Sequence, residues 1–420
     1  MVPSEVFRAG HRDPALAAYA LPAYALLRRR YNGAEERRTV PDAPAKTRID
    51  AIDLIKGLAI IAVVLGHVLV DKGFLNAWVY SFQVPLFFFA AGLVFSVKRP
   101  PKAGADGAKR ASLFGSGKTF GAFVAKKLRQ LMLPYAGFGI VAIVIYLVMG
   151  ALAASILGRG EADLSALDCL YGLIYGNAAL PQLFFYRPLW FLPCIFVMEV
   201  LAGAFVWVLP ESLPPRPKAG LVFAISIVLA ALGLVYKAKV GTPLIWGIET
   251  ACILLPFFAG GYCLRSLAPP ARLEELLAST ARRRIFTALA GVALLSAGIF
   301  FAHVNYTQSG LQSVAYVVND YRITWAFYTS AALQCFAFTA IAFAWKRCRP
   351  LAYLGRHTLW TLGLHKYPIL AFQILPATAA PLADNNIALA AVVVAVAIAF
   401  SLGVEYLAKR ILASIRARKR

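Results

Sequence analysis

The sequence has few charged residues, and acidic ones are the scarcest. Of its 420 residues only 15% are charged, and 20 Asp and Glu stand against 43 Lys and Arg, which gives a formal net charge of +23. With 60% hydrophobic residues and a mean hydropathy of +0.68, this composition excludes a soluble domain and indicates a polytopic membrane protein. The positive charge then reflects topology, so no nucleic-acid partner is expected.

Signals for metal and nucleotide chemistry are also missing. The six cysteines show no CxxC or Cys/His spacing, so neither a zinc site nor a disulfide framework is predicted and no metal is expected. The GSGKT stretch at 115–119 lacks the GxxxxGK[ST] spacing and follows no strand, which argues against nucleotide hydrolysis.

Long apolar runs are what the chain does have. They predict an all-α integral membrane protein, a bundle of about ten transmembrane helices at about 52–72, 75–97, 132–157, 189–209, 220–236, 246–264, 285–303, 323–345, 359–380 and 387–408. If the N-terminus is cytoplasmic, the loops on the inner side of the membrane hold twenty Lys and Arg, and the connections on the outer side hold six. Both termini are therefore predicted to be cytoplasmic, in a multi-pass protein of the cytoplasmic (inner) membrane. We expect a polar, Arg-rich leader (1–47), disordered or interfacial, a transmembrane domain (48–408) and a basic cytoplasmic tail (409–420).

The first span carries Asp53, Lys56 and His67 in an otherwise apolar run. Ionisable groups in a bilayer are costly, which makes these residues functional candidates. Lys56 and His67 lie eleven residues apart, on one helix face and about 16 Å apart along the axis. That face can bind both ends of a long ligand. In the alternative interpretation, Asp53 and Lys56 are an interfacial charge pair and His67 is a packed, hydrogen-bonded histidine.

Polar residues also mark three later spans. They are Gln83 in the second span, Arg187 and Trp190 at the outer boundary of the fourth, and Arg356, His365 and Lys366 at or within the ninth. An aromatic belt at the membrane interface is an alternative explanation for Trp190, and snorkelling to the interface is one for Lys366.

Five segments resemble the membrane-bound acyltransferase 3 family, in particular its fucose 4-O-acetylase-like branch. They are IDLIKGLAIIAVVLGH, YSFQVPLFFFAAG, LRQLMLPY, LWFLPCIF and LGRHTLWTLGLH, in the order of that family. The most specific feature is a basic residue, ten intervening residues and then His, here Lys56 and His67. The chain departs from the family where Gln83-Val84 replaces His-Met and Ala91-Gly92 replaces Ser-Gly.

The resemblance implies an enzyme that moves an acyl group, usually acetyl, from a cytoplasmic coenzyme A thioester to a sugar hydroxyl of a cell-surface or lipid-linked glycan. Acetyl-CoA or another acyl-CoA is then a co-substrate, and no cofactor is permanently bound. His67 acts as general base or as nucleophile, and Asp71 orients its imidazole. The donor-binding candidates are Lys56, Asp53, Arg129, Arg356, His365 and Lys366, with Lys126 as a further one. The acceptor-binding candidates are Gln83, Arg187, Trp190, Asp320 and Arg322.

The rival interpretation is a multi-span transporter or exporter of a lipid-linked sugar or small metabolite, which also needs polar residues within spans. Such folds often contain two matching halves. Residues 210–408 hold no second copy of the Lys56 to His67 pattern, which favours the enzyme. Acceptor identity and oligomeric state are not predicted.

Overall fold

The computed structural model describes residues 49–69, 73–97, 119–157, 164–345, 348–375 and 386–418. These residues form helices and no strand, with a single isolated bridge between Ala315 and Asp320. The elements are α3 (Asp50–Val68), α4 (Phe74–Val94), α5 (Phe120–Lys127), the π-helix η1 (Leu128–Met132), α6 (Leu133–Leu157), α7 (Ala166–Tyr175), the 3₁₀ segment η2 (Pro181–Trp190), α8 (Phe191–Val208), α9 (Pro215–Lys239), η3 (Ile245–Gly247), α10 (Ile248–Leu267), α11 (Pro270–Ala278), α12 (Ala281–Gln308), η4 (Tyr316–Val318), α13 (Thr324–Trp345), α14 (Arg349–Arg356), α15 (Thr358–Leu364), α16 (Lys366–Ile374) and α18 (Ile387–Arg418).

Nine helices in the described part of the chain are long and apolar enough to cross a membrane, and they match nine of the ten predicted spans. The predicted span at 359–380 differs, because the chain breaks at His365 into α15 and α16. Pro368 explains the break: it lacks a backbone N–H, and its ring would clash with the carbonyl of Leu364 in a continuous helix. The all-α membrane fold is confirmed, with one discontinuous segment.

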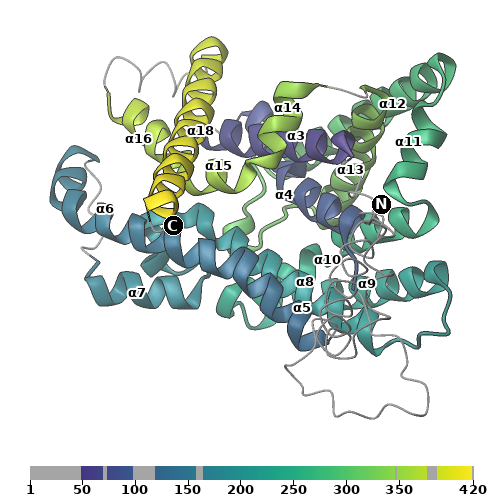
Figure 1. Ribbon diagram of the computed structural model, residues 1–420, viewed down its shortest axis with the longest axis horizontal. Helices are drawn as coiled ribbons and strands as arrows, with labels where there is room; N and C mark the ends of the chain where they lie inside the picture. Colours follow the sequence, from purple (N-terminus) through teal and green to yellow (C-terminus); the bar gives the residue numbers. More distant parts are fainter. Residues whose placement is uncertain are drawn as a thin grey trace, which may run out of the picture. The chain divides into compact units, whose positions relative to one another are not determined.

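The core lies where α3, α4, α10 and α13 pack together (Figure 1). Close approach of α4 and α10 depends on two glycines: a Cβ at Gly92 would overlap the carbonyl oxygen of Phe258, and one at Gly261 would overlap that of Phe89. The hydrophobic effect does not drive helices together inside a membrane, because lipid tails are as apolar as the side chains. Small residues at helix crossings favour association there because they let the two backbones come into close contact.

The short helix α14 lies beside the first half of α3 (Figure 1). Gly57 of α3 lies against α14, since a Cβ there would overlap the carbonyl oxygen of Leu351. Gly355 of α14 lies against α3, since a Cβ there would overlap the carbonyl oxygen of Asp53. Arg356 then reaches α3, where its Nε donates to Asp53 Oδ2 at 3.1 Å and its Nη2 to Asp50 Oδ1 at 3.1 Å. This packing anchors the N-terminal half of α3.

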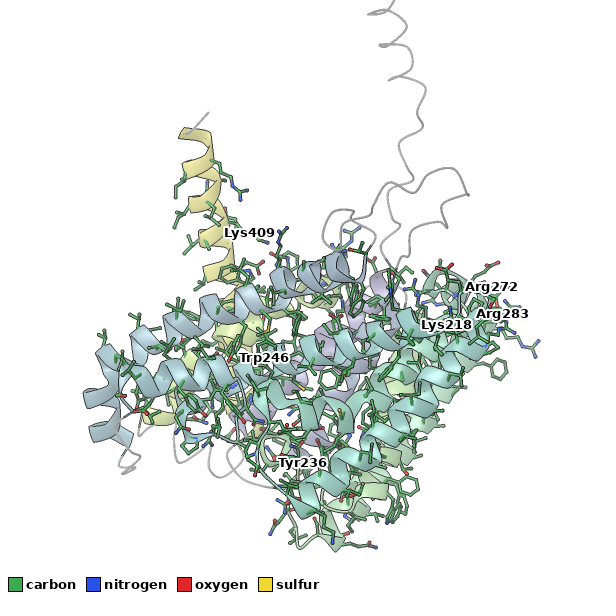
Figure 2. All side chains as sticks on the ribbon, turned by 90° about the horizontal axis from the view of Figure 1, so that it is seen from below. Lys218, Tyr236, Trp246, Arg272, Arg283 and Lys409 are labelled. Atoms are coloured by element: carbon green, nitrogen blue, oxygen red, sulfur yellow. The ribbon has the colours of Figure 1, made fainter. Side chains whose placement is uncertain are left out.

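Four basic residues lie on the side of the helix bundle opposite to Tyr236. Figure 2 shows Lys218, Arg272, Arg283 and Lys409 toward the same edge and Tyr236 at the opposite one. The first three belong to loops predicted to be cytoplasmic, and Lys409 lies near the C-terminal end of α18. The cytoplasmic location of both termini stays a prediction, since it also requires the broken segment of α15 and α16 to cross the bilayer. The leader 1–47 lies outside the described residues.

Candidate functional site

A cavity of about 790 Å³ lies between one face each of α3, α4 and α8, and we call it the α3/α4/α8 cavity. On α3 its wall includes Lys56, Val63 and His67, at positions i, i+7 and i+11, so they share one helix face. Helical spacing also relates the wall residues Asn76, Tyr80, Gln83, Phe87, Ala91 and Val94 on α4, and Phe191, Ile195 and Glu199 on α8. The predicted site residues on this wall are Lys56, His67, Gln83, Arg187, Trp190 and Arg322.

His67 lies in the last turn of α3 and is half-buried. Its ring meets the edge of Tyr80, with centroids 6.5 Å apart, and lies 5.2 Å from the ring of His365. The carbonyl of His67 accepts a hydrogen bond from Gln373 Nε2 of α16 at 3.5 Å. The last turn of α3 therefore contacts both His365 and α16, and α15 contributes Thr358, Leu359 and Leu362 to the cavity wall.

At the other end of the cavity, here called the Lys56 end, an ion pair joins two helices. Lys127 Nζ donates to Glu199 Oε1 at 2.7 Å, and both side chains are on the wall, 20% and 10% exposed. Lys56 lies near enough to act electrostatically on the same carboxylate. Glu199 Oε2 has no hydrogen-bond partner among the described residues.

A π-helix places Lys127 on this wall. Leu128–Met132 forms one wide turn just before Pro134, whose missing N–H and bulky ring do not fit a regular α-turn. The wide turn changes which residues face α8: Lys127 and Gln130 line the cavity, whereas Arg129, predicted to bind the donor, is exposed and is not on the wall. Lys126 is also exposed and off the wall.

Aromatic rings from three elements line the cavity near His67. The ring of Tyr316 in η4 stacks on Trp190 and on Tyr80, with centroids 6.5 and 6.4 Å apart. Its hydroxyl also donates to the carbonyl of Tyr80 at 2.6 Å. Trp190, Tyr316 and Tyr80 thus form an aromatic part of the wall, and of these three rings Tyr80 contacts the imidazole of His67.

A hydrogen-bonded chain holds the loop before α13 against the same end. Asn76 Nδ2 donates to the Gly66 carbonyl at 3.2 Å, and Ser313 Oγ donates to Asn76 Oδ1 at 2.7 Å. Arg322 Nε donates to the Ser313 carbonyl at 2.9 Å, and its Nη1 pairs with Asp320 Oδ2 at 2.8 Å. Arg322 is on the cavity wall, and Asp320, predicted to bind the acceptor, lies behind it as its counter-ion.

Other predicted residues lie off the wall. Asp53 and Arg356 pair with each other across α3 and α14, and His365 and Lys366 lie close to His67. Asp71 lies outside the described residues. Among the described residues, no group of three or more His, Cys, Asp or Glu side chains could hold a metal ion.

Sequence reasoning did not single out several wall residues. Asn76 and Tyr80 precede Gln83 by seven and three residues, so the face that predicts Gln83 also indicates them. Lys127 and Glu199 are each visible in the sequence as ionisable residues at or within an apolar span, but their pairing joins residues 72 positions apart, and Tyr316 comes from a loop, so no local pattern identifies the pair or Tyr316.

Residues 49–406 match the family model described as an acyltransferase domain, of the acyltransferase 3 type. No curated protein and no solved structure matches the chain. The match spans most of the sequence and includes all three helices that form the cavity. The chain therefore belongs to the acyltransferase 3 family of multi-pass membrane acyltransferases.

Proposed function

We propose that this protein is an O-acyltransferase, in particular an O-acetyltransferase, which moves an acyl group from acyl-CoA to a hydroxyl of a sugar in a cell-surface or lipid-linked glycan. One observation carries the proposal: His67 lies on the wall of a cavity of about 790 Å³ whose opposite end is lined by Lys56 and Lys127. Membership of the fucose 4-O-acetylase-like branch stays a prediction.

The donor enters at the Lys56 end in this proposal. The phosphates of a coenzyme A thioester need cationic partners, and the ammonium groups of Lys56 and Lys127 lie on the wall there. Eleven residues of α3 separate Lys56 from His67, a rise of about 16 Å, which suits the extended pantetheine arm. The thioester then lies beside His67.

His67 acts as the general base. One ring nitrogen takes the proton of the acceptor hydroxyl while its oxygen bonds to the acyl carbon, the C–S bond breaks, and the thiolate leaves. The imidazolium then returns its proton to the thiolate, so the products are an ester and free CoA with a thiol. In the covalent variant the same nitrogen attacks the thioester first, and the hydroxyl attacks the acyl-imidazole.

The acceptor binds at the end near His67. Trp190 is only partly buried and offers an aromatic ring, which suits the apolar face of a sugar, and Arg187, Arg322 and Gln83 offer polar groups on the same wall. A transporter also needs a polar cavity, but it does not need an imidazole at the junction of two ligand sites.

The test is transfer by the purified protein in detergent. Released thiol and radiolabelled product report whether acetyl-CoA is hydrolysed or its acyl group is moved to a panel of sugar acceptors. His67→Ala should lose at least about 10²-fold in rate, the scale on which positioned acid–base groups act. His303→Ala is the matched control, because His303 is an exposed histidine of α12 that packs on Phe74 and lies off the cavity wall. Wild-type transfer by the His67 variant would contradict the proposal.

A further inference from the structure

The break between α15 and α16 buries a histidine that the proposed reaction does not yet use. His365 is 0% exposed and sits at the turn that Pro368 imposes. The sequence predicts that His365 binds the acyl-CoA donor, but this residue is not on the wall of the α3/α4/α8 cavity. Its close neighbour is the ring of His67, at a centroid distance of 5.2 Å and an interplanar angle of 33°.

The local helix fixes the tautomer of His365. Its Nδ1 lies 2.9 Å from the carbonyl oxygen of Thr361 and 3.0 Å from that of Leu362. Carbonyl oxygens only accept hydrogen bonds, so Nδ1 must carry the proton and donate. In the neutral ring, Nε2 is then an acceptor with a free lone pair.

That acceptor has no hydrogen-bond partner among the described residues. A buried polar atom without a partner costs about 1–3 kcal/mol, so it calls for an explanation. Two imidazole rings joined by a linear N–H···N bond of about 2.9 Å have centroids about 5 Å apart. The rings of His67 and His365 are already at that separation, and a small rotation about the soft Cβ–Cγ torsion of either ring would align the bond.

We propose that His365 is the positioning residue of His67: its Nε2 accepts a hydrogen bond from one ring nitrogen of His67 and leaves the other nitrogen unprotonated and directed into the cavity. The inference rests on the proposed function. When His67 takes the hydroxyl proton, the N–H that points at His365 is retained, and the hydrogen bond stabilises the imidazolium. The base is thus oriented by a neutral acceptor; the ring edge of Tyr80 contacts His67, and the charge of Lys366 is near enough to act on its imidazole.

Two substitutions separate this role from a structural one. His365→Asn places an amide N–H near the position of Nδ1, where it can still donate to the helix carbonyls, but it has no acceptor at the position of Nε2. His365→Gln places an amide oxygen near the position of Nε2 and loses the donor to the carbonyls. We expect the Asn variant to keep its melting temperature and to lose about 10- to 10²-fold in kcat with little change in either KM. The Gln variant should melt at a lower temperature and recover most of kcat.

Opposite results would overturn the inference. If the Asn variant turns over at the wild-type rate, or if both variants lose activity in proportion to their loss of stability, His365 only packs. The control is His303→Asn, which should leave kcat and stability unchanged. Loss of activity in His67→Ala together with full activity in His365→Asn would reject this inference alone, whereas full activity in His67→Ala would reject the proposed function itself.

Discussion

Gly355 allows a direct test of how α14 holds α3. An alanine Cβ there would overlap the backbone carbonyl of Asp53, and backbone cannot rotate away as a side chain can. Overpacking of this kind costs about 1–3 kcal/mol. Gly220 in α9 is the matched control, since a Cβ there meets no atom within 4 Å. In that open position Gly→Ala should stabilise the helix by about 0.5–1 kcal/mol.

The two alanine variants should therefore differ by about 1.5–4 kcal/mol in unfolding free energy, with opposite signs relative to the wild type. Even 2 kcal/mol changes the folding equilibrium about 30-fold. Equilibrium unfolding in mixed detergent micelles, followed by tryptophan fluorescence, measures the difference. Equal stabilities for Gly355→Ala and Gly220→Ala would refute the close packing of α14 on α3.

Three further predictions concern the cavity and its orientation. Lys56→Ala should weaken acetyl-CoA binding about tenfold and acceptor binding less, because a phosphate loses one charge-assisted contact; calorimetry checks this, and unchanged affinity would remove Lys56 from donor binding. Lys127→Met leaves the Glu199 carboxylate without its partner at 2.7 Å and should destabilise the protein by about 3 kcal/mol. The double variant, Lys127→Met with Glu199→Met, should recover most of that loss in thermal unfolding. If the double variant instead lost as much stability as the two single variants together, the two residues would not form a buried ion pair. In sealed proteoliposomes of known orientation, acetyl-CoA supplied only on the side of the N-terminus should acylate a sugar supplied only on the other side. A requirement for both substrates on the N-terminal side would rule out transfer across the bilayer.

The positions of the membrane-spanning helices can be predicted well from the sequence, because each apolar run must form the hydrogen bonds of its own backbone within the bilayer. The pairing of Lys56 with His67 on one face needs only helical periodicity, and the structure places both on one cavity wall. The one exception among the predicted spans is 359–380, where Pro368 interrupts the helix in the turn before it. A 22-residue apolar window does not reveal it.

Contacts between distant segments were harder to predict. Arg356 appeared to be a donor ligand, yet α14 folds back onto α3 and its guanidinium pairs with Asp50 and Asp53. Arg129 was predicted to bind the donor, but beside the π-helix it is exposed, and Lys127 lines the cavity instead. Charge and span boundaries limit where such residues lie in depth, but only tertiary packing decides which of them face the cavity.

The π-helix at 128–132 also links the number of residues in this segment to the direction in which Lys127 points. A π-turn holds one residue more than an α-turn, so deleting one residue from this segment would restore a regular helix. Winding the same number of residues as a regular helix would instead rotate everything before the segment by about 100° and shift it by about 1.5 Å relative to α6, which would carry Lys127 away from Glu199. A relative with one residue fewer here can therefore keep Lys127 opposite Glu199 on a regular helix, whereas a relative of the same length needs the wide turn.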